Sequence, residues 1–174
     1  MSLASFLDRL RLKTNRWPPG VTQPKEHLFE DELWLPRPPR EVFPFFADAR
    51  NLEFITPPWL KFEVLTPGRI VMRSGARIDY RLKVHGFPLR WRTEITEWEP
   101  PVRFVDTQLR GPYRLWHHTH TFEAKDGGTL CRDRVRYRVP GGELVHRLIV
   151  RRDVERIFRY RQEKLAEQFG RTGP

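Results

Sequence analysis

This sequence is poor in cysteine and has no long apolar run. A single cysteine, Cys131, among 174 residues excludes an intrachain disulfide framework and is typical of a reducing compartment. No segment reaches the run of about 18 apolar residues that a membrane-spanning helix needs. Asp8 and Arg9 interrupt the apolar start of the chain, where a signal peptide requires an unbroken run. We therefore expect a cytoplasmic protein.

Lysine is also scarce, although the formal net charge is +10, because the basic residues are mostly arginine. They are spread along the chain rather than gathered into a tail. The densest run alternates along one expected strand and consists of Arg132, Arg134, Arg136 and Arg138. Such a row can track phosphates or pair with carboxylates such as Glu30 and Glu32 on a neighbouring strand. We favour cross-strand pairing, because like charges along one strand need relief, and we expect no nucleic-acid partner.

Hydrophobic residues at 39% and aromatics at 13% are typical of one globular domain with a sizeable core. Residues 1–26 stand apart as an N-terminal amphipathic segment and linker. Leu3, Phe6, Leu7 and Leu10 have helical spacing and are followed by W-P-P-G. This segment could contact a membrane surface peripherally through residues 1–16, or dock on its own domain or on a dimer partner. Both a monomer and a homodimer remain open.

Residues 27–170 form the main domain, which we expect to be α+β. A strand closed by Pro36 precedes two short helices, the second capped by Asn51 and stopped by Pro57 and Pro58. Six strand signals separated by Pro and Gly turns follow, which indicates an antiparallel meander. A long helix is predicted over 144–169 with Gly170 as its C-cap. A curved sheet of about seven strands that wraps this helix would leave a cavity between them.

The chain resembles the START/Bet v 1-like superfamily, whose helix-grip fold has this order of elements. P-R-E-V-F-P-F-F-A-D-A-R-N-L and F-R-Y-R-Q-E-K-L-A-E-Q-F are similar to its bacterial polyketide cyclase/dehydrase and lipid-transport branch. The resemblance covers about residues 27–170 and implies an internal cavity for a hydrophobic or amphipathic small molecule. That superfamily includes carriers, receptors and cyclases, so the resemblance implies a fold more than an activity, and we carry over no catalytic residue.

The stretch from Arg110 to Phe122 carries the most chemistry. Alternation along a strand sends Trp116, His118 and His120 to one face together with Phe122. Because two of these side chains are bulky aromatics, we expect that face to point into the protein interior. Buried imidazoles need hydrogen-bond partners, which a cavity lined with polar groups supplies. Asp133 should face inward on the neighbouring strand. The candidate catalytic residues are therefore His118, His120 and Asp133.

Two interpretations of this group remain open. A histidine oriented by Asp133 and facing the cavity would act as a general base, whereas a fully satisfied polar network would only set the strand register. H-x-H spacing, with Asp106 or Asp133 as third ligand, also occurs in metal sites. It is common in strands, and no second histidine cluster follows, so we expect no metal and no cofactor.

Arg161 falls in the middle of the apolar stripe of the last helix, so it must find an anion. Asp133 or another inward acid is one partner, and a ligand carboxylate or phosphate is the other. Asp106 and Gln108 share one strand face, although Val105, Thr107 and Leu109 make an equally good inner set. Cys131 is interpreted as packing. The expected ligand contacts are Tyr80, Trp91, Asp106, Gln108, Trp116, His118, His120, Tyr137, Phe158 and Arg161.

Three functions follow from these patterns. The first is a protein that binds a lipid, polyketide, quinone or other aromatic molecule in the cavity between the sheet and the C-terminal helix. The alternative is a cyclase or dehydratase that uses a cavity histidine as general base. The third, an interaction module for polyanions on the arginine face, predicts binding that weakens steeply with salt.

Overall fold

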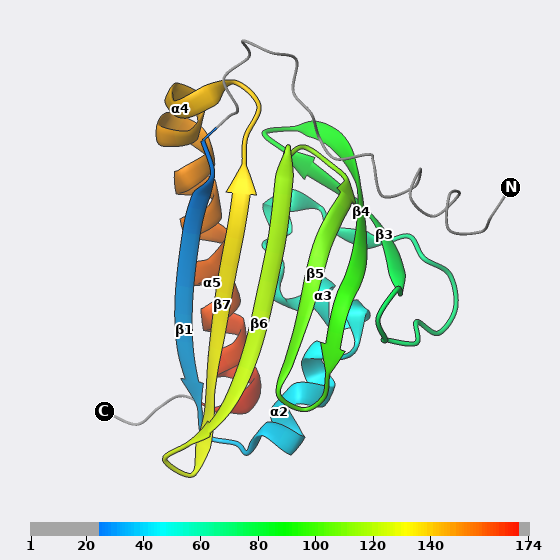
Figure 1. Cartoon of the computed structure of the whole chain (residues 1–174), viewed down its shortest axis with the longest axis vertical. Coiled ribbons are helices and arrows are strands. Elements are labelled where there is room, and N and C mark those ends of the chain that lie inside the picture. The colour runs from blue at the N-terminus through cyan, green and yellow to red at the C-terminus, as the bar shows by residue number, and fades with distance from the viewer. Residues whose placement is uncertain (1–24, 171–174) are drawn as a thin grey trace, which may run out of the picture.

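The computed structural model describes residues 25–170, and the expected N-terminal helix lies outside them. Seven strands form one antiparallel sheet in the order β1-β7-β6-β5-β4-β3-β2 (Figure 1). The strands after the first follow one another as the meander that the turns predicted. Their bounds are β1 His27–Leu35, β2 Glu63–Val64, β3 Arg77–Val84, β4 Phe87–Glu99, β5 Arg103–Arg110, β6 Leu115–Lys125 and β7 Gly128–Arg138.

The two faces of β7 divide as the alternation predicted. Val135 and Tyr137 are buried inward, and the four arginines between and beside them face out and bind carboxylates. Arg132 Nε lies 2.7 Å from Glu32, and Arg134 Nε lies 3.3 Å from Glu30. Both glutamates stand opposite these arginines on β1. The cross-strand interpretation of the arginine row is therefore confirmed.

Two short helices follow β1, α2 (Pro39–Phe46) and α3 (Leu52–Ile55), and a 3₁₀ turn, η1 (Ala49–Asn51), links them. The prediction that Asn51 caps the second helix was wrong in its chemistry. Asp48 accepts a hydrogen bond from the Arg50 amide at the start of η1, while the Asn51 side chain makes no capping bond and donates to the Phe45 carbonyl. Asn51 does occupy the N-cap position of α3, but the side chain that caps a free amide in this segment is the carboxylate of Asp48. A second 3₁₀ turn, η2 (Pro58–Leu60), leads into β2.

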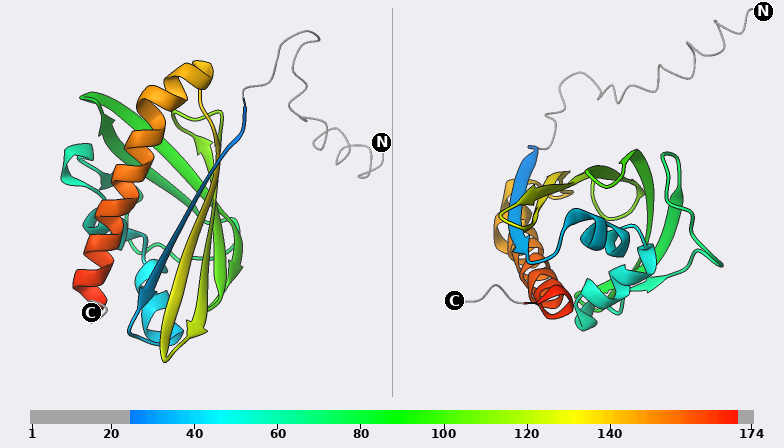
Figure 2. Two further views of the ribbon diagram at one scale, coloured as in Figure 1. Left: turned by 90° about the vertical axis from the view of Figure 1, so that its left-hand side faces the viewer. Right: turned by 90° about the horizontal axis from the view of Figure 1, so that it is seen from below.

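The C-terminal helix begins at Gly142, two residues before the predicted start. It runs through α4 (Gly142–Val145), a π-helical turn η3 (His146–Val150) and α5 (Arg151–Phe169), with Gly170 at its C-cap as predicted. Figure 2 shows this long helix lying across the concave side of the curved sheet. Its buried residues are Val154, Phe158, Arg161 and Leu165. No helix in residues 25–170 is long and apolar enough to cross a membrane.

The core is densest toward the end of the sheet that α2 covers. There Phe43 packs edge-on against Phe122 and Phe104, and Leu165 of α5 joins the same group. A second group surrounds Val135 and Phe158. Between α5 and strands β3 to β5, the side chains do not fill the interior completely.

Candidate functional site

An internal cavity of about 350 Å³ separates α5 from the sheet. Its walls are mostly aliphatic and aromatic side chains from α2, α3, α5 and strands β3 to β6. Eight of the ten expected ligand contacts line it: Tyr80, Trp91, Asp106, Trp116, His118, His120, Phe158 and Arg161. An apolar lining with a few convergent polar groups is the usual form of a small-molecule site.

Gln108 and Tyr137 do not line the cavity. The Gln108 side chain donates to the carbonyl of Tyr113 and accepts from its amide, so it fixes the β5–β6 turn. The Tyr137 hydroxyl lies 2.9 Å from His146 Nε2, away from the cavity. Asp133, one of the candidate catalytic residues, does not line the cavity either; it contacts the two histidines that do. Cys131 packs in the core, where burial raises the pKa of its thiol to about 12, which agrees with its interpretation as a packing residue.

Strand register assembles the polar centre of the cavity. Asp106 of β5 stands opposite His118, and Asp133 of β7 stands opposite His120. Each carboxylate also reaches the diagonal histidine, since i and i+2 side chains share a face. His118 Nε2 and His120 Nδ1 both lie 2.8 Å from Asp133 Oδ1, and His120 Nε2 lies 2.9 Å from Asp106 Oδ2. The two imidazoles thus lie between two carboxylates, with ring centroids 3.7 Å apart.

The surroundings shift the pKa values of the two histidines in opposite directions. Burial and the neighbouring charge of His120 lower the pKa of His118, which is therefore neutral. Burial also disfavours charge on His120, but the charge of Asp133 and its hydrogen bonds with Asp106 and Asp133 outweigh burial and raise its pKa. For Asp133, burial is overcome by the charges of Arg161 and His120 and by both imidazole bonds, which hold its pKa well below the ordinary range. The two carboxylates and the Arg161 guanidinium place charges of both signs around the imidazole pair, which favours a proton on His120 rather than on His118.

Arg161 completes this cluster from α5 but is poorly satisfied by it. Its Nη2 atom lies 3.8 Å from Asp133 Oδ1 and 3.5 Å from His120 Nδ1, and its buried Nε has no hydrogen-bond partner. The guanidinium lies 5.5 Å from the ring centre of Phe46 and 5.7 Å from that of Phe158. Asp133 is the nearest acid, as one interpretation predicted, yet the distance leaves most donors of Arg161 directed elsewhere.

Asp106, His118 and His120 also lie within metal-ligating reach of one another. His118 Nδ1 lies 3.5 Å from Asp106 Oδ2. His118 Nε2 and both ring nitrogens of His120 lie 2.8 to 2.9 Å from carboxylate oxygens, whereas His118 Nδ1 has no contact this short. The ion pairs therefore account for this arrangement without a metal.

The sequence patterns missed the opening of the cavity. His85, in the β3–β4 turn, lies 2.7 Å from Asp153 of α5, and both residues line the cavity. Ile149 of η3 is 46% exposed and also lines the cavity, so this end meets solvent. The H-G dipeptide of the turn, His85-Gly86, marked a tight connection, but no local signal indicates which helix residue it meets.

The comparisons with known proteins agree with this geometry. The family described as polyketide cyclase / dehydrase and lipid transport matches residues 35–166. The chain belongs to this family. The START/Bet v 1-like resemblance and the helix-grip fold are confirmed. No curated protein matches the sequence.

Solved structures of low sequence identity share the fold of this polyketide cyclase/dehydrase family member. The ZhuI aromatase/cyclase from Streptomyces sp. R1128 is 16% identical to this chain, with a TM-score of 0.66. The superposition covers 84% of this chain and 95% of the ZhuI chain. CV1439 from Chromobacterium violaceum is 18% identical with a TM-score of 0.65, covering 83% and 98%. TTHA0849 from Thermus thermophilus is 24% identical with a TM-score of 0.56, covering 82% and 99%.

Proposed function

We propose that this protein binds an apolar or aromatic small molecule that carries an acceptor oxygen, such as a carboxylate or a polarised carbonyl. The observation that carries the proposal is Arg161, a buried cation that lines the cavity and is under-satisfied by its own protein. The apolar walls accept the body of the ligand, and the guanidinium donates to its oxygen. Bidentate recognition of a planar oxyanion is what arginine provides best.

The distribution of charge supports an acceptor rather than a donor on the ligand. Asp106 and Asp133 are occupied by the imidazoles, so neither carboxylate of the polar centre is left to bind a cationic ligand. Phe46 and Phe158 flank the guanidinium and exclude water from it. A ligand oxygen placed there would replace the missing hydrogen bonds of Arg161 in a site of low dielectric constant.

Native mass spectrometry of the purified protein, followed by ligand displacement of an apolar fluorescent dye, tests the binding function. Ile149→Trp should narrow the opening and weaken dye binding at least about tenfold, because Ile149 lines the cavity. Leu148→Trp is the matched control, since Leu148 is 52% exposed on the same turn and does not line the cavity. A tenfold loss corresponds to about 1.4 kcal/mol. Equal dye binding by both variants and the wild type would contradict the proposal.

A second function, a cyclase or dehydratase, is favoured by His118. This imidazole lines the cavity, is neutral, and is oriented by Asp133 at 2.8 Å, which are the properties of a general base. His120 is less suited to this role, because both of its ring nitrogens lie within 2.9 Å of a carboxylate oxygen and neither is left for a substrate. His118→Gln should then abolish turnover of a polyketide-like substrate while leaving its binding unchanged. Full activity in His118→Gln would eliminate this function.

A further inference from the structure

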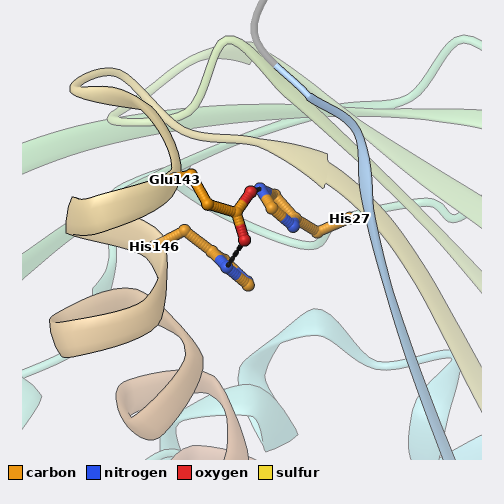
Figure 3. A group of neighbouring side chains, drawn as sticks. All are labelled: His27, Glu143 and His146. Atoms are coloured by element: carbon orange, nitrogen blue, oxygen red, sulfur yellow. Dashed lines mark ion pairs between the residues drawn. The ribbon is translucent and has the colours of Figure 1, made fainter.

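Three ligand-type side chains converge outside the cavity, where β1 and the C-terminal helix begin (Figure 3). They are His27, Glu143 and His146, and their ligand atoms all lie within 4.8 Å of one another. His27 Nε2 lies 3.9 Å from Glu143 Oε2, and His146 Nδ1 lies 3.9 Å from Glu143 Oε1. We propose that these three residues bind one zinc ion.

The local structure explains why the three side chains meet. Glu143 and His146 are three residues apart at the start of the helix, so they share one face. His27 opens β1 directly opposite Tyr137 of β7. Tyr137 in turn holds His146 by its Nε2 atom at 2.9 Å. A hydroxyl that accepts the Nε2 proton leaves the Nδ1 lone pair free for a metal, which is the usual role of a residue behind a histidine ligand.

The ligand atoms converge without bonding to one another. Contacts of 3.9 Å are too long for hydrogen bonds. His146 is only 8% exposed, and its buried Nδ1 has no hydrogen-bond partner. Ligands around a tetrahedral zinc lie about 3.4 Å apart, so each contact must close by about half an ångström. The imidazoles are stacked at 3.4 Å and 10°, and they must tilt to direct both lone pairs at one ion.

The donor set selects the class of ion. Two imidazole nitrogens with one carboxylate oxygen are ligands of zinc and related late transition metals, not of magnesium or calcium. Glu143 has a side chain that is 50% exposed, so water has access to a fourth position once the ion displaces the Lys25 ammonium, which lies 3.6 Å from Glu143 Oε2. His146 also opens the π-helical turn η3, and such turns occur frequently at functional sites. The group of Asp106, His118 and His120 differs, because three of its four imidazole nitrogens already lie within 2.9 Å of a carboxylate oxygen.

A zinc ion here would fasten the start of the C-terminal helix to the first strand. Val145, which lies between Glu143 and His146, lines the cavity together with Val139 and Pro140. The ion would therefore brace the end of the cavity that these residues form. The inference is independent of the ligand that the cavity takes.

Calorimetric titration of the tag-free, full-length protein with zinc chloride tests this site. We expect one zinc per chain and a rise in the unfolding temperature with zinc. Glu143→Gln should weaken zinc affinity more than about tenfold, and it alters a half-exposed side chain, so the fold should persist. His146→Gln should do the same. Glu155→Gln, a partly exposed carboxylate on α5, and His118→Gln in the cavity should bind zinc like the wild type.

Two results would overturn the proposal. One is the absence of zinc binding to the wild type at micromolar concentrations. The other is zinc binding that survives in Glu143→Gln and His146→Gln, or that is lost in His118→Gln alone, since the ion would then lie in the cavity. Cobalt substitution gives a second readout, because a tetrahedral site with nitrogen ligands produces visible absorption that Glu143→Gln should change.

Discussion

Arg161 of α5 lies near the rings of Phe46 and Phe158. How much its charge contributes to stability depends on the partners that Asp133 keeps when the guanidinium is removed. Asp133 accepts hydrogen bonds from both histidines, so removal of the guanidinium does not leave the carboxylate unpaired. Leaving a buried charge without any partner costs about 3–5 kcal/mol. The cost here should be smaller, because only a contact of 3.8 Å is lost.

Arg161→Met should therefore lower the free energy of unfolding of the ligand-free protein by about 1–3 kcal/mol. Affinity for an acidic or carbonyl-bearing ligand should fall more than about tenfold, because bidentate recognition is lost. Urea unfolding and dye displacement measure the two effects, and Arg161→Lys separates charge from geometry. An unchanged affinity for acidic ligands would remove Arg161 from ligand recognition.

The opposite pKa shifts of the two cavity histidines predict a pH signature. The pKa of His120 is raised above its ordinary value of 6.5, so its stabilising contribution is complete below pH 6.5 and is lost as pH rises through the folded-state pKa. The pKa of His118 is lowered, so its folded form loses stability as pH falls below 6.5.

His120→Gln should accordingly destabilise the protein more at about pH 6 than at about pH 9. His118→Gln should show no such alkaline decline in its effect. Urea unfolding at several pH values measures both, and NMR titration of the imidazole protons identifies which ring titrates late. If His120 titrated below 6.5, the charge assignment of the cluster would be wrong.

Among the elements, the junction of β1 with β7 is held by close backbone approach. Gly128 begins β7, and a Cβ built there would lie 2.3 Å from the Leu35 carbonyl oxygen and 2.6 Å from the Trp34 ring. The carbonyl belongs to a paired strand and cannot move freely. Trp34 is itself fixed, since its indole donates to the Lys125 carbonyl at 2.9 Å.

Gly128→Ala should lower the free energy of unfolding by about 1–3 kcal/mol through overpacking. The adjacent Gly127→Ala is the control, because it has open space but a φ of 76°. A left-handed backbone costs an alanine about 1–2 kcal/mol without any clash. Thermal or urea unfolding distinguishes the two, since Trp34→Leu removes one of the two clashes and should reduce, without abolishing, the loss in Gly128→Ala while leaving that of Gly127→Ala unchanged. Equal rescue of both variants would contradict the packing argument.

For the molecule as a whole, one end of the helix-grip fold is solid and the other is open. The aromatic core under α2 closes the first end, and the contact between His85 and Asp153 crosses the second. This contact is partly exposed and therefore contributes little to stability. Its position suggests control over the entry and release of a ligand.

Asp153→Asn should raise the association and dissociation rates of a cavity ligand by similar factors, with little change in affinity. Both residues line the cavity at the end that meets solvent, so we expect the pair to obstruct the path of the ligand rather than to hold its apolar body. Stopped-flow dye binding measures both rates. Glu155→Gln, whose carboxylate pairs with Arg151 on the same helix, is the control and should leave the rates unchanged. A change in affinity alone would place Asp153 in the binding site.

Sequence patterns were sufficient to predict the order of the elements, the inward face of His118 and His120, and the pairing of the arginine row. Each of these depends on local information: alternation along a strand, turn residues, and the repulsion between like charges along one strand, which pairing with carboxylates relieves. Even Asp133 could be predicted as a partner of the histidines, because neighbouring strands of a meander pair in a nearly determined way.

The three-dimensional fold was needed to decide which face of β5 turns inward, because Asp106 and Val105 made equally good patterns. It also decided how incompletely Arg161 is satisfied, since distances of a few tenths of an ångström separate a hydrogen bond from a distant ion pair. The meetings of His85 with Asp153 and of His27 with Glu143 and His146 join residues 68 to more than a hundred positions apart. Such contacts depend on where a helix crosses a curved sheet, and no periodicity in the sequence encodes that crossing.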